Sequence, residues 1–286
     1  MRVITWNVNS FNPARSDDKL HLLELVDWDV ALLQEVGVSA FEVFTSGSFC
    51  GVHAVSLLGG AWDKRAHGVA ILVRGGATIG EGELVPIEED AEAEADHWRR
   101  ARIMSARVSL GGADLTVASF HAPDAAGQRA ERTRKVALKM RLFRSLDLWV
   151  RSTTSPLVIG MDGNVWEDSV EPTALDPLSE FYDQSRFHDS GADHGLRDAM
   201  YEHLTRNRPD LLERRLKLGV RPEDGALAVT YQRSTNNYPK VNRMDRIYVS
   251  RDFRVQDVET FYDEALTVGS DHALVVADVE LDLGGD

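Results

Sequence analysis

Apolar residues occur along this chain in short runs, and several of these runs alternate with polar residues. The segment Arg107-Val108-Ser109-Leu110 alternates with a period of two, which is typical of a β-strand that has one covered face. Similar runs predict strands at 3–6, 30–33, 52–57, 69–73, 103–108, 115–120, 157–159, 247–249 and 273–279. The pattern therefore predicts strands along the whole length of the chain.

Apolar residues at helical spacing separate some of these runs. In the clearest case they fall at i, i+4, i+8 and i+11, with arginine and lysine opposite, which predicts an amphipathic helix over about 128–150. The residues of this stripe are Leu138, Leu142, Leu146 and Trp149. A shorter stripe after Ser16 predicts a first helix, and a third helical region is expected within 173–217.

The chain contains no internal repeat, low-complexity tract or Pro/Gly/Ser-rich linker. Because the predicted strands are spread from one end to the other, we expect a single mixed α/β domain over 1–286. Two sheets packed face to face, with helices outside them, are the natural way to cover so many strands.

The composition is that of a globular protein that can build a large core. Of the 286 residues, 43% are hydrophobic and 27% are charged. A chain of this length buries enough apolar surface to fold without disulfides, and its single cysteine, Cys50, excludes an internal one. Since this fits a reducing compartment, and neither a signal peptide nor an apolar run of ~20 residues is present, we expect a cytoplasmic protein without a membrane span.

The charge balance is acidic, with 46 acidic and 32 basic residues and a net charge of −14. This argues against a protein that coats nucleic acid nonspecifically, because such binding depends on neutralising phosphates with bases. Acidic residues concentrate in 81–96, which we interpret as a solvated loop, whereas bases cluster at Arg99, Arg100 and Arg102 and along 129–151. The basic clusters are either walls of a local nucleic-acid groove or the solvated face of a helix.

Polar side chains that can bind a metal or a phosphate follow directly after several of the apolar runs. These side chains are Asn7, Glu35, His121, Asp162 and Asn164, while Asp271 and His272 stand just before another run. Functional groups commonly lie on loops held by a rigid sheet. Each residue taken singly also has an ordinary explanation, as a turn former or a surface residue. The ordered set is what indicates a site.

Five short segments in a fixed order resemble the endonuclease/exonuclease/phosphatase superfamily. They are Thr5-Trp6-Asn7-Val8-Asn9-Ser10, Leu33-Gln34-Glu35, Ile159-Gly160-Met161-Asp162-Gly163-Asn164, Arg243-Met244-Asp245-Arg246-Ile247 and Gly269-Ser270-Asp271-His272. The resemblance extends from residue 3 to about 280. It implies an α/β fold, a four-layer α-β-β-α sandwich of two packed mixed sheets with outer helices, as in deoxyribonuclease I. It also implies a metal-dependent phosphodiester hydrolase with its site at one edge of the sandwich.

The resemblance implies a set of metal ligands and a water-orienting acid. Glu35 is expected to be the principal Mg²⁺ ligand, helped by Asn7 and Asp271, with Mn²⁺ as a possible substitute. Mg²⁺ takes hard oxygen donors and keeps several waters, so one or two carboxylates suffice. Asp162 is expected to orient or deprotonate the attacking water, and Asn164 to donate a hydrogen bond to a phosphate oxygen.

Two histidines complete the implied site. His272 is expected to contact the phosphate or act as a general base, with Asp245 fixing its tautomer and favouring its charged form. His121 is expected to donate to the phosphate or to protonate the leaving oxygen. Asn9 is a further candidate for the phosphate or metal shell, and Tyr231 for stacking on a base or contacting His121. Phosphodiester hydrolysis requires charge stabilisation, an oriented water and help for the leaving group, and this set offers each of them.

The chain departs from two branches of the family in ways that bear on its substrate. Its opening segment resembles exonuclease III, but His121-Ala122-Pro123-Asp124 replaces the Tyr-x-Pro-Asn of those enzymes, and Arg246 stands where they carry tyrosine. These departures count against abasic-site repair. A histidine at position 121 instead resembles deoxyribonuclease I and the phosphodiesterase branch, although a single cysteine excludes the disulfides typical of deoxyribonuclease I.

We therefore predict an intracellular nuclease that acts on DNA or RNA. The first alternative is the same chemistry on a smaller ester, such as a nucleotide, a phosphoinositide or a phospholipid head group. The two would share their catalytic residues and differ in the loops at 36–50, 87–98, 165–195 and 233–242. The second alternative, a non-catalytic binding module, would be marked by loss of the metal-binding glutamate, the Asp/Asn pair or the terminal histidine, and the sequence retains all of them.

Overall fold

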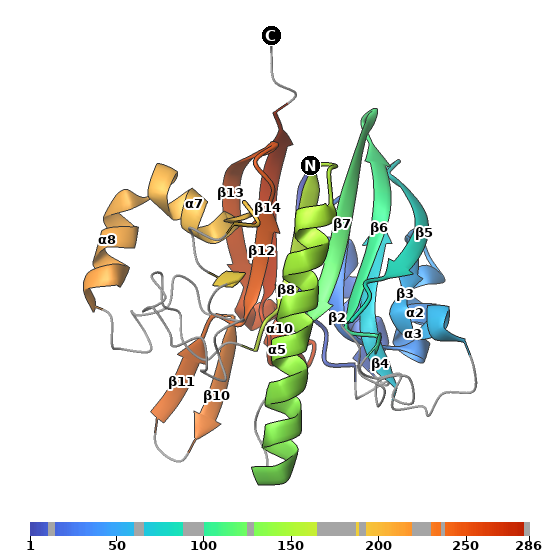
Figure 1. Cartoon of the computed structure of the whole chain (residues 1–286), viewed down its shortest axis with the longest axis horizontal. Coiled ribbons are helices and arrows are strands. Elements are labelled where there is room, and N and C mark those ends of the chain that lie inside the picture. Colours follow the sequence, from blue (N-terminus) through green and yellow to red (C-terminus); the bar gives the residue numbers. More distant parts are fainter. Residues whose placement is uncertain are drawn as a thin grey trace.

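Two sheets packed face to face form the centre of the protein, and helices cover their outer faces (Figure 1). The computed structural model describes residues 1–10, 15–59, 66–87, 100–124, 129–164, 187–188, 193–218, 230–235 and 238–282. Within these residues each of the two sheets has six strands, and a two-stranded hairpin stands apart from them. The predicted four-layer α-β-β-α sandwich is confirmed.

Both sheets mix parallel and antiparallel strands. The first sheet has the order β13-β14-β1-β2-β4-β3, and the second has the order β5-β6-β7-β8-β12-β9. The first consists of β1 (Arg2–Asn7), β2 (Val30–Gly37), β3 (Cys50–His53), β4 (His67–Val73), β13 (Phe253–Phe261) and β14 (Leu274–Leu281). The second consists of β5 (Thr78–Leu84), β6 (Ile103–Leu110), β7 (Ala113–His121), β8 (Leu157–Asp162), β9 (Arg197–Asp198) and β12 (Asp245–Val249). The hairpin consists of β10 (Tyr231–Thr235) and β11 (Tyr238–Asn242).

Alternation along the strands divides the apolar residues into three buried cores. In β1, Val3 belongs to the core between the sheets, whereas Ile4 and Trp6 belong to the core beneath the helices of the first sheet. Those helices are α1 (Ser16–Leu25), α2 (Val38–Thr45) and α10 (Tyr262–Thr267), and the short α3 (Ala54–Leu58) contributes to the core between the sheets. The third core lies between the second sheet and the stripe of α5 (Arg129–Ser152), as its spacing predicts.

Two further helices lie on one side of the sandwich, the first beside β13 and β12 and the second against the first (Figure 1). They are α7 (Ala199–Asn207) and α8 (Pro209–Leu218), and they contribute Leu204 and Leu212 to the core between the sheets. They match the later part of the third helical region expected from the sequence, to within one residue at its end; 173–186 and 189–192 of that region lie outside the described residues. No helix in the described ranges combines the length and apolarity that a bilayer crossing demands.

Two of the predicted segments differ in the structure. The run at 52–57 is divided, because β3 ends at His53 and α3 follows; an apolar run this short has no period that separates strand from helix. Glu81 and Glu83, expected in a loop, lie on the edge strand β5 with both side chains exposed. Charged side chains on an edge strand hinder pairing with other chains. The remaining acidic residues, at 88–96, lie outside the described residues.

A close approach of the two sheets predicts that Gly160 cannot be enlarged without loss of stability. A Cβ at Gly160 on β8 would lie 2.6 Å from the Leu32 Cβ and 2.8 Å from the Thr5 Cβ of the facing sheet. Both atoms are fixed to strand backbones, so the sheets must shift. We expect Gly160→Ala to lower the free energy of unfolding in urea by about 1–3 kcal/mol. Gly80→Ala, where the nearest atom is 3.6 Å away, is the control; equal losses would contradict the argument.

Candidate active site

The direction of the strands brings the predicted site residues to one edge of the sandwich. β1 and β2 are parallel, as are β7 and β8, so the carboxyl ends of each pair meet at the same edge. β14 and β12 run antiparallel to β1 and β8, so their amino ends lie there too. His121 and Asp245 are consequently both register partners of Asp162. Asn7 Nδ2 donates to Asp162 Oδ2 at 2.8 Å, which links the ends of the two sheets.

A cavity of about 360 Å³ lies at this edge. Eight of the ten predicted residues line it: Asn9, Glu35, His121, Asp162, Asn164, Tyr231, Asp271 and His272. The other two, Asn7 and Asp245, are buried beside residues of its lining, which they contact. The lining also includes Arg102, Pro123, Asp124, Lys135 and Met244, which the sequence did not assign to the catalytic set.

Three hydrogen bonds hold the Asp162 carboxylate in place. Its Oδ1 accepts from the Asn164 backbone N–H at 2.9 Å, and its Oδ2 accepts from the Asn7 and Asn164 amides at 2.8 and 3.3 Å. The Asn164 amide also donates to the Ala122 carbonyl at 2.7 Å. Both N–H groups of the Asn164 side chain are therefore directed to the protein, and they hold the Asp162 carboxylate in one orientation.

Three site residues have left-handed backbone conformations, and they are the only non-glycine residues with positive φ in the described part of the chain. They are Asn9, Glu35 and Asn164, with φ of 46°, 53° and 50°. Asparagine tolerates this conformation, but glutamate does not favour it. Glu35 lies at a β-bulge of β2, where the register against β4 shifts between Leu33 and Val36. Bulges re-aim side chains near functional sites, and this one directs Glu35 to the cavity.

Two buried lysines hold the left-handed asparagines. Lys19 on α1 donates to the Asn9 carbonyl at 2.8 Å, and Lys139 on α5 donates to the Asn164 carbonyl at 2.5 Å. Each asparagine also donates its backbone N–H to the strand-end side chain two residues earlier. The pKa of each lysine is lowered to about 8, by burial in both cases and by the charge of Arg15 in addition at Lys19. Helices on opposite faces of the sandwich thus fix equivalent turns after β1 and β8.

His272 is paired with the buried carboxylate of Asp245, as the sequence predicts. Its Nδ1 lies 2.9 Å from Asp245 Oδ2, and its Nε2 lies 3.9 Å from Asp162 Oδ2. Burial alone would lower the pKa of His272, but the carboxylates of Asp245, Asp162 and Asp271 outweigh it and raise that pKa well above its usual value. Thr230 positions Asp245, because its Oγ1 accepts from the Asp245 backbone N–H at 3.0 Å. The Tyr231 ring lies 4.9 Å from the His272 ring.

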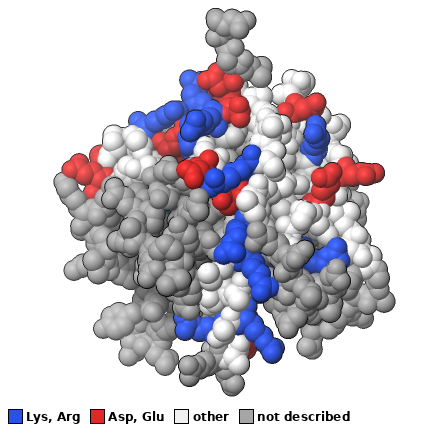
Figure 2. Space-filling model, in the orientation of Figure 1, with Lys and Arg blue, Asp and Glu red and all other residues white. Residues whose placement is uncertain are grey.

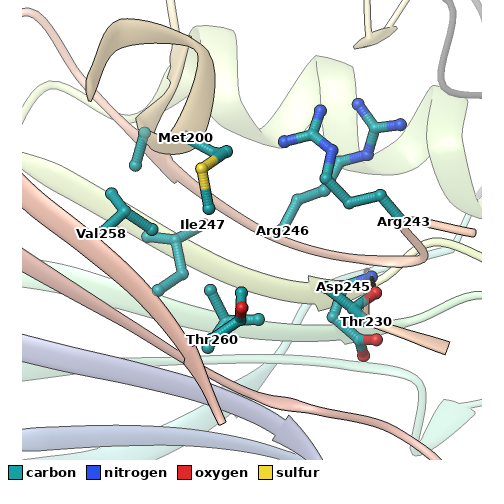
Figure 3. A pocket seen from close by; sticks show the side chains of 10 residues that line it. Met200, Thr230, Arg243, Asp245, Arg246, Ile247, Val258 and Thr260 are labelled. Atoms are coloured by element: carbon teal, nitrogen blue, oxygen red, sulfur yellow. Dashed lines mark hydrogen bonds between the residues drawn. The ribbon is translucent and has the colours of Figure 1, made fainter. Parts of the chain in front are cut away.

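The arginines on either side of Asp245 in the sequence are directed away from it (Figure 3). Arg243 makes two hydrogen bonds to the Asp198 carboxylate, at 2.9 and 2.6 Å, and Arg246 lies 3.5 Å from the same carboxylate. Asp198 also caps α7 by accepting from the backbone N–H groups of Met200 and Tyr201. A cavity of about 10 Å³, at the lower limit for one water, lies beneath this group. Both arginines therefore pair with Asp198, while the Asp245 carboxylate faces His272.

His121 has the opposite electrostatic surroundings. Its Nδ1 lies 2.9 Å from Arg102 Nη1, and its Nε2 lies 3.4 Å from Glu35 Oε1 and 3.6 Å from Asp162 Oδ2. Burial, followed by the positive charges of Arg102 and His272, lowers the pKa of His121 well below its usual value. The cavity therefore contains one histidine that favours its charged form and one that favours its neutral form.

The cavity offers oxygen ligands that fit a divalent cation. Burial and, after it, the Asp162 carboxylate raise the pKa of Glu35 to about 7, so a bound cation would relieve an unfavourable concentration of negative charge. Asp271 uses Oδ1 to accept from the Asn9 amide at 2.9 Å and keeps Oδ2 for a ligand. Asn7 Oδ1 accepts from the Asn9 backbone N–H but retains a second lone pair. A further buried group, Asp162, Asp245 and His272, has its ligand atoms within 4.8 Å of one another.

The raised pKa of Glu35 predicts a pH dependence of stability in the metal-free protein. The folded protein binds this proton more tightly than the unfolded chain, so stability falls as pH rises from about 4.5 to about 7 and then stays low. A difference of this size corresponds to roughly 3 kcal/mol. In EDTA, urea unfolding of Glu35→Gln should lack this decline. Mg²⁺ should stabilise the wild type more near pH 8 than near pH 5, because the cation competes with the proton. Parallel pH curves for the two proteins would contradict the assignment.

Comparisons with known proteins identify the family and the fold. A sequence model described as the Endonuclease/Exonuclease/phosphatase family matches residues 4–272. No curated protein matches the chain. TDP2 of D. rerio, solved with a single-strand DNA product, aligns with a TM-score of 0.65 at 14% identity over 98% of each chain.

Two other solved structures share the fold at similarly low identity. The 3′ phosphatase NExo from Neisseria, bound to a product DNA hairpin, has a TM-score of 0.61 at 19% identity and covers 98% of this chain and 99% of its own. The human Nocturnin catalytic domain with bound sulfate has a TM-score of 0.57 at 17% identity, covering 98% and 93%. Because the family match spans nearly the whole chain, this protein belongs to the endonuclease/exonuclease/phosphatase family of hydrolases.

Proposed function

We propose that this protein is a divalent-metal-dependent phosphodiesterase that cleaves nucleic acid. One observation carries the proposal: the Asp162 carboxylate, held by hydrogen bonds, lies within 4 Å of two histidines, at 3.6 Å from His121 and 3.9 Å from His272. Hydrolysis of a phosphodiester needs an oriented water and positive or hydrogen-donating groups around the phosphoryl oxygens. This cavity provides both within one small volume.

Glu35 and Asp271 are the proposed ligands of a Mg²⁺ ion, with the free lone pair of Asn7 Oδ1 as a third donor. These are hard oxygen donors, which suit Mg²⁺ and Mn²⁺. When bound, such a cation neutralises developing charge on the phosphoryl oxygens. Proton competition at Glu35 would make its binding weaker in acid.

Asp162 is the proposed water-orienting residue. Its carboxylate is fixed by Asn7 and Asn164 and faces the cavity, so it can accept a hydrogen bond from an attacking water. We assign Asn164 to holding Asp162, since both of its side-chain N–H groups are already directed to protein oxygens. His272, held in its charged form by Asp245, is proposed to stabilise the phosphoryl oxygens rather than to act as a general base.

The charge on α5 supports nucleic acid as the substrate. The sequence of this helix contains eight basic and two acidic residues, in a chain with a net charge of −14. Basic side chains gather over the helix on one face of the molecule (Figure 2). Lys135 of the same helix lines the cavity, so the basic surface begins at the site itself. A row of bases leading from a phosphate site suits a polyanion better than a single phosphate ester.

A smaller phosphate ester is the second candidate, and the size of the cavity favours it. A volume of about 360 Å³ lies within the range of small-molecule sites. The acidic net charge also disfavours long-range attraction of a polyanion. Several loops would distinguish the two candidate substrates. The parts of these loops that lie outside the described residues are 88–98, 165–186, 189–192 and 236–237.

A substrate panel with Mg²⁺ and with Mn²⁺ tests the proposal. It contains plasmid, linear duplex, single-stranded DNA, RNA, bis-p-nitrophenyl phosphate and inositol phosphates. We expect cleavage of at least one nucleic acid and of bis-p-nitrophenyl phosphate, and complete loss of both activities in EDTA with recovery on adding metal. Activity that survives thorough chelation would refute the metal-dependent mechanism. Activity on an inositol phosphate alone would select the second candidate.

A further inference from the structure

The register of the second sheet places an arginine directly behind one of the two cavity histidines. Arg102 immediately precedes β6 and His121 ends β7, one position beyond the paired residues Ile103 and Phe120. The His121 backbone N–H donates to the Arg102 carbonyl at 2.9 Å, and the two side chains meet at 2.9 Å between Arg102 Nη1 and His121 Nδ1. Both side chains line the cavity. Their contact is thus fixed by the strand pairing and does not depend on a loop.

This contact determines which nitrogen of His121 carries the proton. A guanidinium group has only N–H donors, so His121 Nδ1 must accept, and the single ring N–H must be on Nε2. That N–H faces the cavity, 3.4 Å from Glu35 Oε1 and 3.6 Å from Asp162 Oδ2. His272 has the reverse arrangement, because its Nδ1 faces the Asp245 carboxylate and therefore carries a proton. The Asp245 carboxylate thus contacts His272, and the Arg102 guanidinium contacts His121.

We propose that Arg102 is a positioning residue that holds His121 as its Nε2–H tautomer, so that His121 donates a hydrogen bond to a phosphoryl oxygen. The acceptor, a phosphoryl oxygen, rests on the proposed function. The tautomer does not, because it follows from the contact with Arg102. It separates two roles that the sequence left open for His121. A ring whose Nδ1 accepts from Arg102 has one proton, directed at the substrate, and it serves as a fixed donor. To deliver a proton to the leaving oxygen, the His121 ring would first have to be protonated on both nitrogens. Arg102 opposes that state, because its N–H would then face the Nδ1–H of the ring.

The tautomer can be measured without any activity. Long-range ¹H–¹⁵N spectra of the imidazole rings in ¹⁵N-labelled, metal-free protein distinguish protonated from unprotonated nitrogens, and His121→Asn identifies the signals. We expect a protonated Nε2 and an unprotonated Nδ1 in the wild type, and a mixture of tautomers in Arg102→Met. Arg102→Lys, which keeps a group that only donates, should preserve the wild-type pattern. A protonated Nδ1 in the wild type would overturn the proposal, and this spectrum decides even if the Arg102 variants do not fold.

A double-mutant cycle separates positioning from direct binding of substrate by Arg102. Arg102→Met should lower kcat by about 10- to 100-fold with little change in KM, and it should have almost no effect in a His121→Asn background. Arg107→Met, at an exposed position of β6, is the matched control and should be neutral. A raised KM that persists without His121 would overturn the proposal in favour of a substrate contact. If no substrate is cleaved, the proposed function fails, but the spectra still test the tautomer.

Discussion

Glu35→Gln is expected to lower the metal-dependent phosphodiesterase activity by roughly 10³-fold or more. Glutamine has nearly the same shape but no charge, so it loses most of its affinity for Mg²⁺. Charge neutralisation by a bound cation contributes several kcal/mol to a phosphoryl-transfer transition state, and each 1.36 kcal/mol is a factor of about ten in rate. The measurement is kcat/KM on bis-p-nitrophenyl phosphate across a Mg²⁺ titration, which separates weaker metal binding from a lower rate at saturation.

The fold of Glu35→Gln should stay intact, because the substitution removes a partly buried charge whose desolvation is unfavourable. In the absence of metal its thermal unfolding temperature near pH 8 should be higher than that of the wild type. Glu42→Gln, at an exposed position of α2, is the matched control and should leave both stability and rate unchanged. Wild-type rates in Glu35→Gln would exclude the metal role for this residue.

The fold follows from the sequence to a large extent because its strands carry simple periods. The runs that became β1, β4, β6, β7 and β8 were placed within a few residues of their ends, and so was the long helix α5. Strands without a continuous apolar run were not predicted. β5 exposes alternate polar residues at an edge, and β13 has a mixed pattern with a bulge, so neither contains the signal on which the prediction depends.

The candidate site was predicted because polar residues at strand ends are close in sequence to strong apolar signals. The sequence placed Glu35 directly after a strand, and the structure places it inside β2, which continues to Gly37 beyond a bulge. A bulge arises from pairing with a neighbouring strand, and a left-handed glutamate arises from the contacts around it. Neither has a local signature in the sequence.

The sequence did not identify the two buried lysines of the site. Lys19 and Lys139 lie beside the apolar stripes of their helices, and only the packed structure shows that they bond to the carbonyls of Asn9 and Asn164. His53 is also buried and His188 is partly buried, and desolvation lowers the pKa of each ring. Burial of single polar residues depends on tertiary contacts, so spacing within the sequence does not reveal it.

His272→Ala is expected to lower the rate by roughly 10²- to 10⁴-fold, the range for losing a charged donor at a phosphoryl oxygen. The loss should be in kcat, because the charge matters most as the transition state forms. His21→Ala, at an exposed position of α1, is the control and should be neutral. A near-normal rate in His272→Ala would move the role to another residue of the cavity.

Asp245→Asn tests the cause of that effect through pH. The Asp245 carboxylate, only 2.9 Å from His272, opposes the burial that would otherwise lower the pKa of the imidazole. The charged form is present below that pKa and is lost as pH rises through it. Removing the carboxylate lowers the pKa, so the alkaline limb of the kcat profile should move to lower pH in Asp245→Asn. The same substitution should cost almost nothing further in His272→Ala, because both act through one charge. Additive losses, or an alkaline limb that does not move, would mean that Asp245 acts on the substrate by another route.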